Sequence, residues 1–154
     1  MIDNPFHDEQ EKTRQQKEFK LQCHIVQKHE IYFPHVLMTA FPGRPGDAKD
    51  GFFKKMMGVK PGIPDILLWF RTNKLHAGAV EIKVDARISS AQNKVISTMH
   101  GMGIHTGVAR SWQEYYKLLC SFGIKPVYVC TRFDEPDYST EQQKFAAAFD
   151  MYRP

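Results

Sequence analysis

The sequence lacks the cysteine pairs and long apolar runs that mark several common protein classes. Its 154 residues include three cysteines, Cys23, Cys120 and Cys130, with no Cys-x-x-Cys spacing. This excludes a disulfide framework or a zinc ribbon and predicts plain buried thiols. No apolar run approaches the roughly 18 residues that a membrane-spanning helix needs. The N-terminus lacks the layout of a secretory signal, so we expect a cytoplasmic protein with no membrane partner.

The charge excess is small but unevenly distributed along the chain. The formal net charge is +4, in a composition that is 42% hydrophobic and 25% charged, as in ordinary globular proteins. The segment 49–60 carries four lysines against one acid. A basic segment of this kind is compatible with a polyanionic partner, although a charge run is often only a solvated surface. Three of these lysines are therefore candidate DNA contacts: Lys54, Lys55 and Lys60.

Hydrophobic patterning predicts one α/β domain over residues 1–154, with a mixed central β-sheet flanked by helices. In the first helix, Phe19, Cys23 and Val26 recur at helical spacing with Leu21 and Ile25 beside them, and these residues are expected to form one apolar face. The continuous apolar run 66–70 predicts a strand that is covered on both faces, and 104–109 predicts a third central strand. Helices are expected over 7–30, 47–57, from the N-cap Ser90 to about Met102, from a capping box at Ser111 to near Gly123, and over 140–150. The predicted strands are 35–41, 66–70, 77–84, 104–109 and 127–130.

Two acidic residues flank the polar turn at 71–76. If the strands on either side form an antiparallel hairpin centred on Asn73, Asp65 lies opposite Glu81, because each is eight residues from Asn73. Directly opposed side chains have Cβ atoms about 4.5–5.5 Å apart, and like charges placed so are destabilising. A divalent cation is the simplest compensation, since Mg²⁺ is typically held by one or two carboxylates with waters and phosphate oxygens.

A lysine completes the chemistry of this pair. Lys83 is two residues beyond Glu81, so on a strand its side chain points to the same face. An ammonium there can orient an attacking water or stabilise charge on a phosphate. Two carboxylates, a lysine and a divalent metal are the parts needed for phosphodiester hydrolysis. A second copy of the tripeptide, Glu18-Phe19-Lys20, falls in a predicted helix, where its two charged side chains would not share a face.

Several motifs follow one another in an order that is more specific than any one of them: a glycine-rich loop, an aspartate, two apolar strands, Glu-x-Lys and a capped helix. They are Gly58-Val59-Lys60-Pro61-Gly62-Ile63-Pro64-Asp65-Ile66-Leu67-Leu68, Val80-Glu81-Ile82-Lys83, Ser90-Ala91-Gln92, Gly101-Met102-Gly103, Val108-Ala109-Arg110-Ser111 and, upstream, Glu18-Phe19-Lys20-Leu21-Gln22. Over about residues 16–120, this pattern resembles the virus-type replication-repair nuclease (VRR-NUC) family of the PD-(D/E)xK nuclease superfamily. Residues 121–154 are a C-terminal strand and helix extension without a counterpart. Many members carry an Asn-Gly-like turn where this chain has Phe41-Pro42-Gly43-Arg44-Pro45.

The resemblance implies a restriction-endonuclease-like core and a Mg²⁺- or Mn²⁺-dependent endonuclease. Stand-alone members are small, often phage-encoded homodimers that act on branched DNA such as four-way (Holliday) junctions, which implies a bacterial or phage-infected host cell. Carried over by position, Asp65 and Glu81 become metal ligands, with the carbonyl of Ile82 as a third and Glu18 as a further carboxylate near the metal. Catalytic roles pass to Lys83, Asp65, Glu81 and the helix residue Gln92.

Two other interpretations remain open from the sequence. One is a non-catalytic DNA-binding module that keeps the fold, with structural acids. The other is a restriction-type nuclease that cuts linear duplex at a short sequence. Arg110, at the end of a predicted strand beside the site, is a further candidate phosphate contact.

Overall fold

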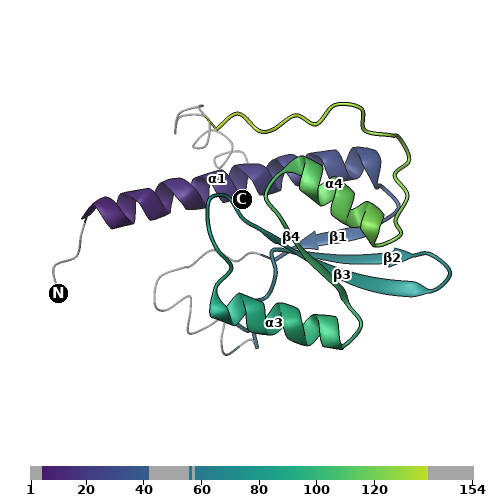
Figure 1. Cartoon of the computed structure of the whole chain (residues 1–154), viewed down its shortest axis with the longest axis horizontal. Helices are drawn as coiled ribbons and strands as arrows, with labels where there is room; N and C mark the ends of the chain where they lie inside the picture. The colour runs from purple at the N-terminus through teal and green to yellow at the C-terminus, as the bar shows by residue number, and fades with distance from the viewer. Residues whose placement is uncertain (1–4, 42–55, 57, 139–154) are drawn as a thin grey trace.

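The computed structural model describes residues 5–41, 56 and 58–138 of the chain, with side chains described from Thr13 onward. Lys54, Lys55, the loop 42–46 and the predicted helix 140–150 lie outside the described residues, as does the predicted helix 47–57 apart from Met56. Measured along the described part of the chain, no helix combines the length and the apolar character needed to cross a membrane. The elements are α1 (Pro5–Tyr32), β1 (Leu37–Ala40), β2 (Ile66–Arg71), β3 (Leu75–Ile82), α3 (Ser90–Gly101), β4 (His105–Ala109) and α4 (Trp112–Ser121) (Figure 1).

The four described strands form one mixed sheet in the order β1-β2-β3-β4. β1, β2 and β3 pair antiparallel, and β4 pairs parallel to β3 after the crossover through α3. Figure 1 shows α1 and α4 on one side of the sheet and α3 on the other. The predicted α/β class, with a mixed sheet flanked by helices, is confirmed. The prediction that 104–109 is a central strand is wrong for the described sheet, because β4 is at its edge.

The two faces of β2 differ in how well they are covered. Ile66, Leu68 and Phe70 are buried in the core beneath α1 and α4. On the opposite face Leu67 is half-buried, and Trp69 is 39% exposed. The expectation that this strand is covered on both faces is therefore wrong, because the face of β2 that bears Leu67 and Trp69 is only partly covered. Burial alternates along β2, as expected for a strand with one face on the core, although its sequence is an unbroken apolar run.

The buried face of α1 is formed by Leu21, Ile25 and His29, each fully buried. Of the predicted apolar face, Leu21 and Ile25 are buried as expected, whereas Cys23 is exposed and Phe19 and Val26 are only half-buried. Histidine is a polar residue type, yet both ring nitrogens of His29 are bonded inside the core. Nδ1 lies 2.8 Å from the Tyr115 hydroxyl, and Nε2 lies 3.1 Å from the Val36 carbonyl oxygen. Burial lowers the pKa of His29, which favours the neutral ring.

The three cysteines and the aromatic residues of α4 differ in their burial. Only Cys130 is buried, whereas Cys23 and Cys120 are exposed, so the expectation of three buried thiols was wrong for two of them. Trp112 and Tyr115 of α4 are both fully buried. The side chains of α4 therefore close the core from above the sheet.

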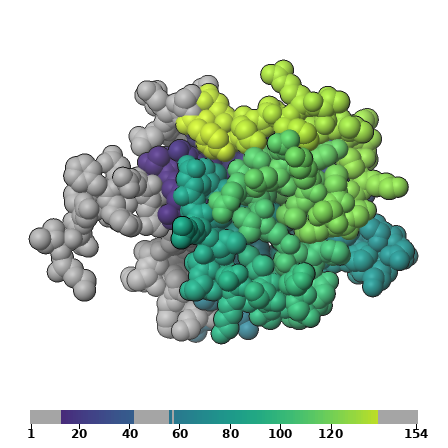
Figure 2. All heavy atoms as spheres, viewed as in Figure 1, coloured from purple at the N-terminus to yellow at the C-terminus, as the bar shows by residue number. Residues whose placement is uncertain are grey.

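No strand forms at the predicted position 127–130. The residues after α4 run instead as an extended segment, 124–138, along α1 and α4 (Figure 1). The Val127 N–H donates to the Tyr32 carbonyl at 2.8 Å, and the Cys130 N–H donates to the Tyr116 hydroxyl at 3.2 Å. Figure 2 shows this segment, in yellow-green, covering the upper side of the molecule. Its apolar residues do not enter a sheet, and Val129 is 79% exposed.

Candidate active site

The hairpin of β2 and β3 sets the geometry of the site. Ile66 pairs with Val80 and Arg71 with Leu75, so the register is symmetric about Asn73, as predicted. Extended by one residue, it places Asp65 opposite Glu81 at the end of the hairpin away from the turn. The backbone carbonyl of Asp65 accepts the N–H of Phe41 at 2.7 Å, and its Oδ2 accepts the N–H of Ile82 at 2.8 Å. These two bonds hold Asp65 between Phe41, which directly follows β1, and Ile82 of β3.

Glu81 is a buried carboxylate with its two oxygens in different environments. The residue is 1% exposed. Oε1 accepts from the Lys83 ammonium at 2.8 Å and from the side-chain amide of Gln92. Oε2 is buried and has no hydrogen-bond partner in the described structure. A buried, unpaired carboxylate oxygen is costly, and in native proteins it calls for a ligand, an ion or a proton.

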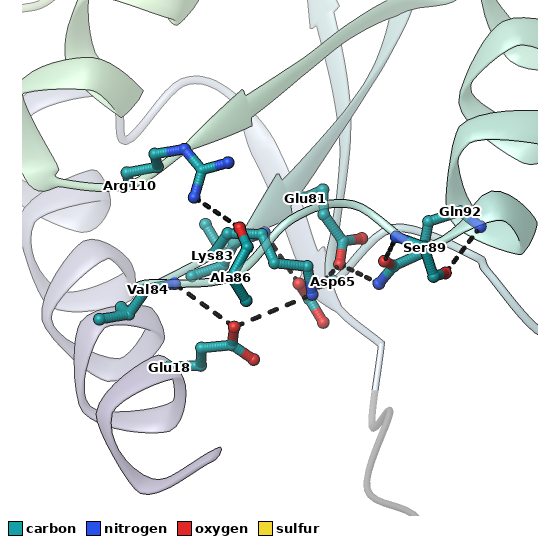
Figure 3. A network of polar contacts seen from close by, with 10 residues as sticks. Glu18, Asp65, Glu81, Lys83, Val84, Ala86, Ser89, Gln92 and Arg110 are labelled. Carbon is teal, nitrogen blue, oxygen red and sulfur yellow. Dashed lines mark hydrogen bonds and ion pairs between the residues drawn. The ribbon is translucent and has the colours of Figure 1, made fainter. Parts of the chain in front are cut away.

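Lys83 directly follows β3, and its backbone N–H still donates to the Ala109 carbonyl at 3.1 Å. Its ammonium therefore stays on the same side of the sheet as Glu81. From α1, Glu18 approaches this ammonium at 3.9 Å, and its Oε1 accepts the N–H of Val84 at 3.3 Å. Lys83 thus lies between two carboxylates from different elements (Figure 3).

Burial raises the pKa of both central carboxyls. The pKa of Glu81 rises to about 7, first through burial and then through repulsion by Asp65, with partial relief from Lys83. The pKa of Asp65 is also raised by burial, against the N–H of Ile82 and the charge of Lys83, which lower it. A pair of acids that resists double ionisation is stabilised in its charged form by a nearby cation.

Gln92 reaches the carboxylate of Glu81 from the first turn of α3. The N-cap of this helix is Ser89, so the predicted N-cap at Ser90 is wrong by one residue. The Ser89 Oγ accepts from the Gln92 N–H at 3.2 Å, and the Gln92 Oε1 accepts from the Ser89 N–H at 2.9 Å, which together form a capping box. Ser89 is the residue near the site that sequence reasoning missed. The Ser-x-x-Gln spacing was the signal that could have identified it.

The basic residues predicted as phosphate contacts lie around this centre rather than in it. Lys60 is exposed in the loop before Asp65. Arg110 is exposed, and its Nη1 donates to the carbonyl of Ala86 at 2.8 Å (Figure 3). This bond anchors the segment 84–89, which joins Lys83 to the N-cap of α3. Asp85, in the same segment, lies 3.5 Å from Lys17 of α1.

The loop before Asp65 packs directly on the first turn of α3. Gly62 has φ +85°, and a Cβ built there would lie 2.6 Å from the carbonyl oxygen of Ala91 and 2.9 Å from the backbone nitrogen of Gln92. Backbone atoms cannot move aside as the end of a flexible side chain can. The position therefore requires glycine both for its conformation and for its space.

We expect Gly62→Ala to destabilise the protein by about 2 kcal/mol or more, because left-handed strain of about 1 kcal/mol adds to the backbone collision. Gly58→Ala is the matched control, since Gly58 has φ +82° with no described heavy atom within 4 Å of the added Cβ. Urea unfolding of the two variants measures the difference. Equal losses at both positions would show that the contact with α3 contributes nothing.

Comparison with known proteins places the chain in a family. The sequence model of the VRR-NUC domain matches residues 6–113, which include every described residue of the site. Among solved structures, a chain described as a VRR_NUC domain protein aligns with a TM-score of 0.50 at 20% identity, covering 69% of this chain and 87% of that chain. At that identity the likeness shows the fold alone. No curated protein matches the sequence.

Proposed function

Because this chain belongs to the VRR-NUC family of nucleases, we propose that it is a divalent-metal-dependent endonuclease that hydrolyses phosphodiester bonds in branched DNA such as four-way junctions. The observation that carries the proposal is Oε2 of Glu81, which is buried and has no hydrogen-bond partner among the described residues. Oε1 of the same carboxylate contacts the Lys83 ammonium, and Asp65, directly before the neighbouring strand β2, lies opposite Glu81. An orphaned carboxylate oxygen next to a second acid is the arrangement that a hard cation stabilises.

The residues present fit Mg²⁺ or Mn²⁺. Asp65 and Glu81 would hold the ion, with the backbone carbonyl of Ile82 as a further oxygen ligand. Among the described residues, no group of three or more His, Cys, Asp or Glu side chains could hold a metal. A site of two carboxylates completed by a carbonyl, water and phosphate oxygens is typical for Mg²⁺. When bound, the ion would lower the pKa of a coordinated water and neutralise charge on the scissile phosphate.

The remaining side chains have separate tasks in this proposal. Lys83 donates a hydrogen bond to the attacking water or to the phosphate oxygen on which charge develops. Glu18 acts through its contact with Lys83, and it is a further candidate carboxylate near the ion. Gln92 holds Glu81 from the side of α3. We also propose that the whole chain, residues 1–154, forms one nuclease domain.

DNA would be bound by the exposed basic residues that surround the centre. We propose phosphate contacts for Lys60 and Arg110, and for Lys54 and Lys55 in the basic segment that precedes the site. One catalytic centre in each chain cuts one strand at a time, so paired incisions across a junction require two copies. We therefore propose a homodimer as the active form.

A panel of end-labelled DNA substrates tests the function. A four-way junction and a linear duplex of the same sequence are incubated with Mg²⁺ or Mn²⁺ at one stated salt concentration, because binding to DNA depends steeply on salt. The proposal predicts cleavage of the junction in preference to the duplex. Preferred cutting of the duplex would favour the restriction-type interpretation. Binding of the junction without cleavage under any of these ions would favour the non-catalytic module.

A further inference from the structure

The two oxygens of Glu81 are not equivalent, and the difference arises from the residues around them. Oε1 receives two donors, the Lys83 ammonium at 2.8 Å and the Gln92 side-chain amide. Oε2 receives none from the described residues and is buried. Since the whole residue is 1% exposed, bulk water does not compensate for the missing partner. The Glu81 carboxylate is therefore held through Oε1, and Oε2 is left for a ligand.

The capping box at the start of α3 fixes which end of the Gln92 amide faces Glu81. A glutamine side chain carries an acceptor oxygen and a donor NH₂, and an unrestrained amide can turn either one toward a neighbour. Here Oε1 of Gln92 accepts the Ser89 N–H at 2.9 Å. Only the NH₂ is then left for Glu81. The same pair of residues closes the box through the Ser89 Oγ and the Gln92 N–H at 3.2 Å.

We infer that the N-cap of α3 is part of the ion site. Gln92 is a positioning residue, oriented by Ser89, that occupies Oε1 of Glu81 and so reserves Oε2 for the divalent cation. Outer partners that orient a ligand typically contribute about 10- to 100-fold to metal affinity or activity. This inference rests on the proposed function, because it assigns a purpose to the oxygen that the ion would bind.

Gln92→Met tests the inference without DNA, because methionine keeps a similar length and volume but cannot donate. We expect isothermal titration to show Mn²⁺ affinity about 10- to 100-fold weaker than in the wild type. The matched control is Ser111→Ala at the N-cap of α4, where the Ser111 Oγ accepts from the Glu114 N–H at 3.0 Å. That variant loses the N-cap hydrogen bond of another helix but should bind Mn²⁺ as the wild type does. Wild-type affinity in Gln92→Met would overturn the inference.

A second variant separates positioning from helix capping. Gln92→Glu retains a capping box, because glutamate at this place accepts the N-cap N–H as glutamine does. It cannot donate to Glu81 and adds a like charge. We expect a folded protein that cleaves the wild-type DNA substrate with a kcat at least about 10-fold lower. Its dissociation constant for that DNA should stay within about twofold of the wild-type value. A wild-type kcat would mean that Gln92 serves only the helix.

Asp65→Asn, measured in the same titration, keeps failure of the inference distinct from failure of the proposed function. Loss of Mn²⁺ binding in Asp65→Asn with unchanged binding in Gln92→Met would overturn only the role of Gln92. Unchanged binding in Asp65→Asn would show that the ion is held elsewhere, and the proposed function would fail together with the inference.

Discussion

Asp65→Asn and Lys83→Ala are each expected to lower the rate of DNA cleavage by at least about a hundred- to a thousandfold while DNA binding persists. An asparagine in place of Asp65 would keep an oxygen for the Ile82 N–H, which Asp65 now accepts at 2.8 Å, so the fold should survive the loss of charge. Lys83→Ala removes the only ammonium that contacts Glu81 in the described structure. Single-turnover cleavage and electrophoretic mobility shift measure the two properties separately.

The matched control for these substitutions is Asp85→Asn. The Asp85 side chain is 75% exposed and contacts Lys17 on the surface, two residues beyond Lys83. Neutralising it should change the cleavage rate by no more than a few fold, since exposed ion pairs contribute little. Full activity in Asp65→Asn or in Lys83→Ala would contradict the assignment of the active site.

Removal of divalent metal is the second change with a large expected effect. EDTA should abolish cleavage, and Mg²⁺ or Mn²⁺ should restore it. The ion should also stabilise the fold, by about 2.7 kcal/mol at a concentration about 100 times its dissociation constant, which corresponds to several degrees in the melting temperature. The physical reason is that the cation binds acids that burial otherwise disfavours in their charged form.

Glu81→Gln identifies the origin of this stabilisation. With the charge of Glu81 removed, Mn²⁺ should no longer raise the melting temperature. Glu30→Gln, at an exposed position on α1, should retain the full shift. A metal-dependent shift that persists in Glu81→Gln, or cleavage that continues in EDTA, would count against the metal centre described above.

The sequence was sufficient for the hairpin and its acids because that prediction depends on local rules. A tight polar turn fixes the register of the strands on either side, and the register about Asn73 follows from the lengths alone. The same reasoning brought Lys83 to the face of Glu81. The expectation that Gln92 faces the site came from the family resemblance, since nothing local to residue 92 indicates what the first turn of α3 contacts.

Other features depend on tertiary contacts that no local pattern contains. The apolar run at 127–129 satisfies the pattern of a strand, but the Val127 N–H donates to the carbonyl of Tyr32 at the end of α1, and the run pairs with no strand of the described sheet. His29 belongs to the buried face of α1 only because Tyr115 and Val36 supply partners for its ring. The raised pKa of Glu81 arises from burial, which depends on elements distant in sequence.

The predicted N-cap of α3 is wrong by one residue, and here the reason is local. Ser89 and Ser90 are both good N-cap residues. The deciding residue is the one three positions later, where Gln92 can return a hydrogen bond to Ser89. The reciprocal Ser-x-x-Gln pair, rather than a serine alone, predicts the correct start of α3.

The extended segment 124–138 has a consequence for the order in which the molecule assembles. Lys28 of α1 lies 2.8 Å from the carboxylate of Asp134, and Lys20 donates to the Asp137 carbonyl at 3.4 Å, across 106 and 117 residues respectively. Contacts of such sequence separation form late, because a long loop must close before they stabilise anything. A chain emerging from the ribosome therefore contains Asp65, Glu81 and Lys83 before residues 124–138 are available to contact α1, the helix that carries Glu18. The β2–β3 hairpin, which positions the two acids, is synthesised before the segment 124–138 that packs along α1.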